Sequence, residues 1–399
     1  MAGLRDVRWR ALVLCAAALI TASSLASCSW LRPTTDNCMG DGNVPVGRDS
    51  TGPAAPGQPS PVAEALWVAD ESGVLRAFDG RTNEVSARVD IGRSAFPPVL
   101  GVGGGLVWVY RDDGGVVLVD PVTARVTRRA MVVPARPLAD NRLSYAHRAL
   151  WIAQPGRLWR VSTSGKVSSI QLPADFKATV AAATDRWLWL AGGRRLVRVD
   201  PEGQTVTVAG ELPVDVEIGH LSDARSRLLA VGWNKSEIWV LDPDSGALES
   251  SIKIPDGELV MSVVSAGDDV WAMGNCGHAV RVTGTEHPQV HKVQVSNVSQ
   301  DLGAAAAIGS LWVADEGRSE LVRIDLQTAE VIARLPVTAA DPDDPAFAVV
   351  AGQHSVWLID TNLANGVLHV DPTTNRVLRL TSSIGVSLGV SAVVAPPPP

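Results

Sequence analysis

Short runs of alternating apolar and polar residues fill the chain from about residue 62 onward. The clearest pair is 310–315 (SLWVAD) and 320–325 (ELVRID), and this alternation predicts paired β-strands. The unit recurs roughly every 40 residues, and a strand repeat of that length is typical of a β-propeller. We therefore predict an all-β propeller of about eight four-stranded blades, with seven as the alternative. One large apolar residue marks each copy: Trp67, Trp108, Trp151, Trp189, Leu229, Trp271, Trp312 and Trp357.

The two ends of the repeat array predict how the ring closes. The first copy has almost no innermost strand before Trp67, whereas a strand is left over after the last copy, at residues 384–393. We predict that this C-terminal strand completes the first blade, because a closed ring leaves no open edge between its blades. The propeller then spans residues 62–395, and a proline tail of residues 396–399 ends the pairing.

The N-terminus reads as an export and anchoring segment. Residues 1–27 place three arginines before an apolar run, as in a secretory signal peptide. The next residues, Leu25-Ala26-Ser27-Cys28, resemble the lipobox of bacterial lipoproteins, which implies that Cys28 becomes the lipidated first residue. Residues 28–61, rich in Pro and Gly, then form a tether. We expect a lipid-anchored protein on the extracytoplasmic side of the cell membrane; a secreted protein cut nearby is the alternative.

The net charge bears on the class of partner, and the cysteines indicate a possible disulfide. The formal net charge of −7 does not favour nucleic acid as a partner. With Cys28 lipidated, Cys38 and Cys276 are the remaining pair outside the signal peptide, and an oxidising compartment would allow them to form a disulfide.

Two polar positions recur in most copies and are therefore structural. A residue with a short polar side chain ends each third strand, where it can accept hydrogen bonds from the following turn. Two residues earlier, a basic side chain is expected along a blade interface in several copies. The first set is Asp79, Asp120, Ser162, Asp200, Asp242, Thr283, Asp325 and Asp371, and the second is Arg160, Arg198, Arg281, Arg323 and His369.

Acidic residues that do not repeat predict a candidate ligand or cation face. They follow the Trp strands of four consecutive blades, or lie in the connection between blades seven and eight, on one face of the ring. Clustered carboxylates there could hold Ca²⁺ or attract a cationic ligand, and solvated turn residues are the alternative. The set is Asp70, Glu71, Asp112, Asp113, Asp315, Glu316, Asp341, Asp343, Asp344 and Asp360. The other four blades carry Gln154, Arg157, Arg194, Arg195, Asn234, Lys235, Asn275 and His278.

A zinc site is not expected, although four candidate ligands lie close in sequence. The candidates are Cys276, His278, His287 and His291. Cys276 and His278 precede a strand whereas His287 lies in the turn after it, so the strand holds them roughly 16 Å apart. Zinc ligands must lie within about 2 Å of the metal. Common signatures of nucleophilic, nucleotide-binding and zinc hydrolase sites are also absent from the sequence.

The repeat pattern resembles the YVTN-type and related NHL-like propellers of secreted bacterial proteins, over residues 62–394. Its motif residues belong to strands and hairpins, so the resemblance implies the fold more than the function. Some relatives are lyases that open cyclic peptide antibiotics with a His and acidic residues around a divalent metal. His220 and His278 match that His only by their face of the ring, with no matching local motif.

Two functions follow as expectations. The preferred one is a monomeric binding or assembly module in the cell envelope, without a required cofactor, that holds a protein, a glycan or a small ligand. The alternative is a metal-assisted hydrolase or lyase that acts at the acidic face.

Overall fold

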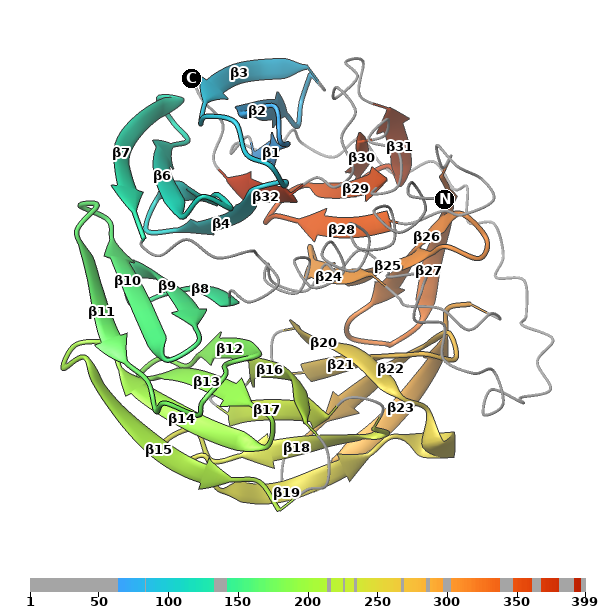
Figure 1. The fold of residues 1–399 in the computed structure, drawn as a ribbon. Helices are drawn as coiled ribbons and strands as arrows, with labels where there is room; N and C mark the ends of the chain where they lie inside the picture. The colour runs from blue at the N-terminus through green and yellow to red at the C-terminus, as the bar shows by residue number, and fades with distance from the viewer. Residues whose placement is uncertain are drawn as a thin grey trace, which may run out of the picture.

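The computed structural model is a ring of eight four-stranded antiparallel sheets around a central axis (Figure 1). It confirms the predicted β-propeller and decides for eight blades over seven. The structure describes residues 64–82, 84–132, 142–213, 217–224, 227–232, 235–266, 269–284, 288–296, 303–337, 347–360, 367–379 and 391–395. The predicted signal peptide, Cys28 and nearly all of the tether lie outside these ranges. Within them, no helix is long and apolar enough to cross a membrane.

Each blade is ordered from its innermost strand, at the axis, to its outermost strand. Blade one consists of β32 (Ser391–Ala395), β1 (Ala65–Ala69), β2 (Val74–Asp79) and β3 (Val85–Asp90), and blade two of β4 (Val99–Gly103), β5 (Leu106–Tyr110), β6 (Gly115–Asp120) and β7 (Arg125–Met131). Blade three consists of β8 (Arg142–Ala146), β9 (Ala149–Gln154), β10 (Arg157–Ser162) and β11 (Val167–Gln171), and blade four of β12 (Val180–Ala183), β13 (Leu188–Gly192), β14 (Arg195–Asp200) and β15 (Thr205–Glu211).

Blades five to eight follow the same order, with one short 3-10 helix, η4 (Pro255–Gly257), before blade six. Blade five consists of β16 (Ile218–Ala224), β17 (Arg227–Gly232), β18 (Glu237–Leu241) and β19 (Leu248–Lys253), and blade six of β20 (Val260–Ala266), β21 (Asp269–Gly274), β22 (His278–Thr283) and β23 (Gln289–Gln294). Blade seven consists of β24 (Ala304–Ala307), β25 (Ser310–Asp315), β26 (Glu320–Asp325) and β27 (Val331–Pro336), and blade eight of β28 (Phe347–Ala351), β29 (Val356–Asp360), β30 (Val367–Asp371) and β31 (Arg376–Arg379).

The C-terminal strand closes the ring as predicted. β32 pairs antiparallel with β1, with Val393 opposite Trp67 and Ala395 opposite Ala65. Residues 391–393 of the expected strand, 384–393, belong to β32, and residues 384–390 lie outside the described ranges. The seam is also fastened by Glu64, whose carboxylate accepts hydrogen bonds from Gln353 N at 2.7 Å and His354 N at 3.0 Å in blade eight.

The repeated tryptophans form the packing between blades. All seven Trp of the second strands are almost fully buried, and Trp239 in the third strand of blade five is buried where the second strand carries Leu229. Truncating a buried aromatic residue to Ala typically costs about 3–5 kcal/mol, so these positions dominate the stability of the ring. The tryptophans therefore serve the fold rather than a site.

The two repeated polar positions have the predicted structural roles. Asp325 Oδ1 accepts hydrogen bonds at 2.8 Å from both Gln327 N and Thr328 N, and so fixes the hairpin. Arg323 lies over the Trp312 ring at 4.8 Å and donates to Pro372 O, at 2.7 Å, in the next blade. The repeated aspartate therefore fixes a hairpin within its blade, and the repeated arginine joins neighbouring blades.

Candidate functional site

The face that carries the loops between second and third strands is called the rim here. The acidic residues predicted on the rim bind other groups of the same loops or of the neighbouring connections. Asp70 is 1% exposed, its Oδ2 lies 2.8 Å from Arg76 Nη1, and its Oδ1 accepts a hydrogen bond from Ser72 N at 2.9 Å. Glu71, the next residue, is partly exposed. The arginine neutralises the buried carboxylate, which makes Asp70 part of the blade structure.

Other rim carboxylates join the blade connections to the loops. Asp112 in blade two accepts hydrogen bonds from Ser94 Oγ at 2.5 Å and Ala95 N at 3.0 Å, both in the connection from blade one. Glu316 in blade seven accepts from Phe347 N, at 3.0 Å, at the start of blade eight. In both places a carboxylate satisfies backbone N–H groups that no strand pairs, so its first role is structural.

The remaining acidic predictions give no shared metal site among the residues the structure describes. Asp113 pairs with Arg111, and this guanidinium holds the pKa of the carboxyl below its usual range. Asp315 is fully buried, and its Oδ1 accepts a hydrogen bond from Arg318 N at 3.2 Å. In the described ranges, no three His, Cys, Asp or Glu side chains are grouped so that they could hold a metal ion. Asp341, Asp343, Asp344 and the side chain of Asp360 lie outside the described part.

The neutral and basic half of the rim contains one buried carboxylate that the sequence did not single out. Glu258 follows η4 and is 2% exposed. Its Oε1 accepts hydrogen bonds from Cys276 N at 3.0 Å and His278 N at 3.3 Å, and its Oε2 lies 2.9 Å from His278 Nδ1 and 3.4 Å from Lys292 Nζ. Glu258 therefore anchors the loop of blade six in the way that Asp112 and Glu316 anchor theirs.

The other predicted residues of this half are also held locally. Gln154 is buried and accepts a hydrogen bond from Trp159 Nε1 at 3.1 Å, and Asn275 Oδ1 accepts from Leu259 N at 2.9 Å. Arg194 and Arg195 form ion pairs with Glu211 and Asp175. Arg157 lies 5.4 Å from the Trp159 ring, Lys235 O accepts from Val260 N, and Asn234 lies outside the described residues.

Cys276 is disulfide-bonded. Cys38, which the sequence suggests as its partner, lies outside the described residues, so that pairing stays a prediction. His287, one of the four candidate zinc ligands, lies outside them too.

A cavity of about 610 Å³ lies on the axis of the ring, and we call it the channel. All eight innermost strands contribute to its lining. Each of these strands is the last of its sheet, so the backbone groups on its inner edge face the channel instead of another strand. Ligand sites usually have volumes of about 300–1,000 Å³, a range that includes this channel.

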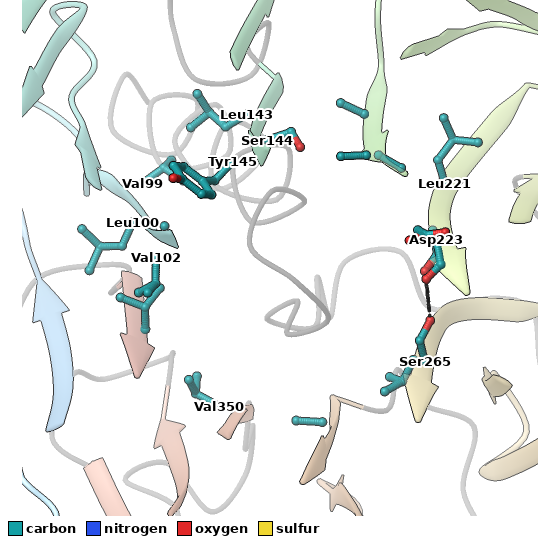
Figure 2. A pocket seen from close by; sticks show the side chains of 18 of the residues that line it. Val99, Leu100, Val102, Leu143, Ser144, Tyr145, Leu221, Asp223, Ser265 and Val350 are labelled. Atoms are coloured by element: carbon teal, nitrogen blue, oxygen red, sulfur yellow. Dashed lines mark hydrogen bonds between the residues drawn. The ribbon is translucent and has the colours of Figure 1, made fainter. Parts of the chain in front are cut away.

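The channel wall has an apolar side and a polar side. In Figure 2, Val102 and Val350 lie across the channel from Asp223 and Ser265. The apolar side comes from blades one, two and eight and the polar side from blades five and six. The apolar lining includes Val99, Leu100, Val102, Val349, Val350, Val393 and Val394, and the polar lining His220, Ser222, Asp223 and Ser265.

Two polar atoms of blade five are buried on this wall without a hydrogen-bond partner. They are His220 Nε2 and Asp223 Oδ1. Burial lowers the pKa of His220 to about 4, which keeps its imidazole neutral, and it raises the pKa of Asp223, with a smaller contribution from the negative charge of Asp185. Glu258 Oε2 and Asp315 Oδ2 on the rim also lack a hydrogen bond, but they lie 3.4 Å from Lys292 Nζ and 3.9 Å from Arg334 Nη1. An unpaired buried polar atom is costly, and Asp223 has no such cation beside it among the described residues.

Blade six fixes the strand that carries these groups. Ser265 Oγ donates to the backbone carbonyl of Asp223 at 2.9 Å and lies 3.5 Å from Ser222 Oγ (Figure 2 marks the contact between residues 223 and 265). The hydroxyl satisfies an edge carbonyl and leaves the carboxylate of Asp223 unused. The polar wall is therefore held in place by the neighbouring blade.

The innermost strands of the sequence contain a signal for this wall. The innermost strand of blade seven is Ala304–Ala307, and blade four has Val180–Ala183, whereas blade five has Ile218–Ala224 with His220, Ser222 and Asp223. Comparing innermost strands across blades would have marked these residues as exceptions. His220 itself was singled out only by its face of the ring.

Comparisons with known proteins support the fold. No protein-family model and no curated protein matches the chain. Among solved structures, apo AztD from Citrobacter koseri has 13% identity and a TM-score of 0.60, covering 84% of this chain and 99% of that chain. The dihydro-heme d1 dehydrogenase NirN in complex with DHE has 18% identity and a TM-score of 0.57, covering 81% and 75%.

A third similar structure is a catalytically inactive virginiamycin B lyase from Staphylococcus aureus with quinupristin. It has 14% identity and a TM-score of 0.51, covering 66% of this chain and 91% of that chain. At such identities the three structures share the propeller fold with this chain.

Proposed function

We propose that the protein is a lipid-anchored binding module of the cell envelope, whose propeller holds a small ligand in the channel. The observation that carries the binding role is the channel itself: about 610 Å³, with an apolar side and a polar side. An apolar pocket with a few polar groups is the usual form of a small-molecule site. The anchor rests on the signal-like segment and on the match of residues 25–28 to a lipobox.

The described acidic residues of the rim have a structural role, unlike Asp223 of the channel. Its described carboxylates, Asp70, Asp112 and Glu316 among them, hold arginines and backbone N–H groups. These contacts give the described carboxylates a structural role instead of a role in metal-assisted hydrolysis or elimination.

Recovery of a bound compound tests the binding role. The full chain is purified from its bacterial host in detergent, and native mass spectrometry measures any small molecule retained. A Cβ at Gly101, which lines the channel, would meet no atom within 4 Å, so Gly101→Trp places an indole in the channel without a clash at its Cβ. Val208→Trp, on the exposed outermost strand of blade four, is the matched control.

We expect a retained compound in the wild type and in Val208→Trp, and its loss in Gly101→Trp. Equal retention in both variants would contradict binding in the channel. The anchor is tested separately by labelling with radioactive palmitate: Cys28→Ala should lose both the label and the partition into detergent. A labelled, membrane-bound Cys28→Ala protein would contradict lipidation at this residue.

A further inference from the structure

Among the lining residues that the structure describes, the channel wall contains one acidic side chain and no Lys or Arg. Asp223 is that acid, and neither Lys nor Arg is among the residues that line the channel there. This differs from the rim, where the carboxylates of Asp70 and Asp113 each have an arginine beside them. The described channel therefore presents a negative charge without a countercharge of its own.

The carboxylate of Asp223 and the imidazole of His220 can both accept hydrogen bonds from a ligand. A carboxylate only accepts, and a neutral imidazole accepts through its unprotonated nitrogen. The hydroxyl of Ser265 is already used as a donor to the carbonyl of Asp223. The innermost edge adds unpaired backbone N–H and C=O groups, and its carbonyls can accept hydrogen bonds from a ligand. A ligand that suits this wall must bring donors and positive charge.

The opposite wall requires the rest of the ligand to be apolar. Val102 and Val350 lie across the channel, and Tyr145, with Leu143 beside it, adds an aromatic surface (Figure 2). Tyr145 is itself packed against Trp108, with ring centroids 5.5 Å apart, so its ring is held in place. Its hydroxyl is buried without a partner and offers one more polar contact for a bound molecule.

We propose that the channel binds a small organic monocation, an amine whose ammonium group lies against Asp223 and His220 and whose apolar body packs on the Tyr145 and valine side. This inference rests on the proposed binding role of the channel and specifies its ligand class. An ammonium group supplies both the missing countercharge and the missing donors. A charge-assisted hydrogen bond to a buried carboxylate is stronger than one between neutral groups.

Three indole compounds of similar size test the ligand class: tryptamine as the cation, tryptophol as the neutral alcohol and indoleacetate as the anion. Their affinities for the full chain are measured by isothermal titration calorimetry at neutral pH. We expect tryptamine to bind most tightly, tryptophol more weakly and indoleacetate most weakly. In Asp223→Asn the tryptamine affinity should fall about tenfold or more, the usual effect of losing a charged hydrogen-bond partner.

Glu202→Gln is the matched control, because it removes one exposed carboxylate in a hairpin turn away from the channel. Its tryptamine affinity should equal that of the wild type. Preference for tryptophol or indoleacetate, an unchanged affinity in Asp223→Asn, or no binding by any of the three would overturn the amine assignment. The proposed binding role fails by a different result, retention of the native compound in Gly101→Trp, so the two failures are distinguishable.

Discussion

Two regions of the propeller carry acidic side chains, the loops of the rim and the innermost strands of the channel. On the rim, Asp112 and Glu316 lie in loops and accept hydrogen bonds from backbone N–H groups where a neighbouring blade begins or is joined. Glu258 lies in the connection before blade six and accepts a hydrogen bond from the backbone of a loop, at Cys276 N. In the channel, Asp223 Oδ1 is buried without a partner. The number of carboxylates in a region is therefore a poor guide to function here; what matters is whether each is already satisfied.

The largest expected effect concerns the ring on which both regions depend. Deleting residues 391–399 removes β32, which pairs with β1 and lines the channel with Val393 and Val394. The first blade would lose its innermost strand, so we expect the cooperative thermal transition to disappear. Circular dichroism melting measures this, and a truncated chain with an unchanged melting temperature would contradict closure by β32.

Glu258 tests the structural role of the rim. Glu258→Ala removes the acceptor of two loop N–H groups and the carboxylate beside His278, while Lys292 keeps its ion pair with Asp256, so the free energy of unfolding should fall by about 3–5 kcal/mol. Denaturant titration measures the loss. Affinity for tryptamine should stay unchanged, because Glu258 does not line the channel. A loss of binding without a loss of stability would reverse the roles of the two regions.

Two buried imidazoles make the stability of the protein depend on pH, and only one of them lines the channel. Burial lowers the pKa of His369 to about 4, against smaller opposing effects of Asp371 and Asp79, and the pKa of His220 is lowered to a similar value. The unfolded chain takes up these protons first, near pH 6.5. Stability is therefore full above that pH and falls by about 1.4 kcal/mol per pH unit for each His as the pH drops toward 4.

His369→Gln and His220→Gln should each flatten this fall when melting is followed between pH 7 and 4. Only His220→Gln should also weaken tryptamine binding, because His369 packs on Trp357, with ring centroids 4.3 Å apart, and does not line the channel. If neither variant changes the slope of stability against pH, the assignment of neutral imidazoles at these positions is wrong.

The disulfide at Cys276 is expected to stabilise the rim side of blade six. Reduction, or Cys276→Ser, should lower the free energy of unfolding by about 2–4 kcal/mol. Peptide mapping without reduction should recover Cys276 joined to Cys38. A bond between Cys276 and Cys28 would contradict both that pairing and lipidation of Cys28.

The fold was accessible from sequence because its signals repeat. The buried Trp312 and its counterparts, together with hairpin residues such as Asp325, mark the blades, and those positions have the predicted roles. A repeat reports what all blades share, so it predicts architecture more readily than a site.

The site was only partly accessible. Asp70 and Asp315 were grouped by their place after a strand, but sequence does not show that an arginine and a loop N–H lie beside them. Asp223 stands within a strand and has no motif around it. Its significance depends on which atoms face the axis and lack partners, and this follows from packing between blades five and six rather than from local sequence.

The most direct test of the central claim compares the thermal stability of two matched variants, Asp223→Asn and Asp70→Asn, in protein freed of ligand. The channel carboxylate lacks a partner, so neutralising it should leave stability unchanged or raise it by up to about 1 kcal/mol. The rim carboxylate is paired with Arg76, so the same change should cost about 1–2 kcal/mol. Equal losses in both variants would contradict a channel carboxylate held free for a ligand.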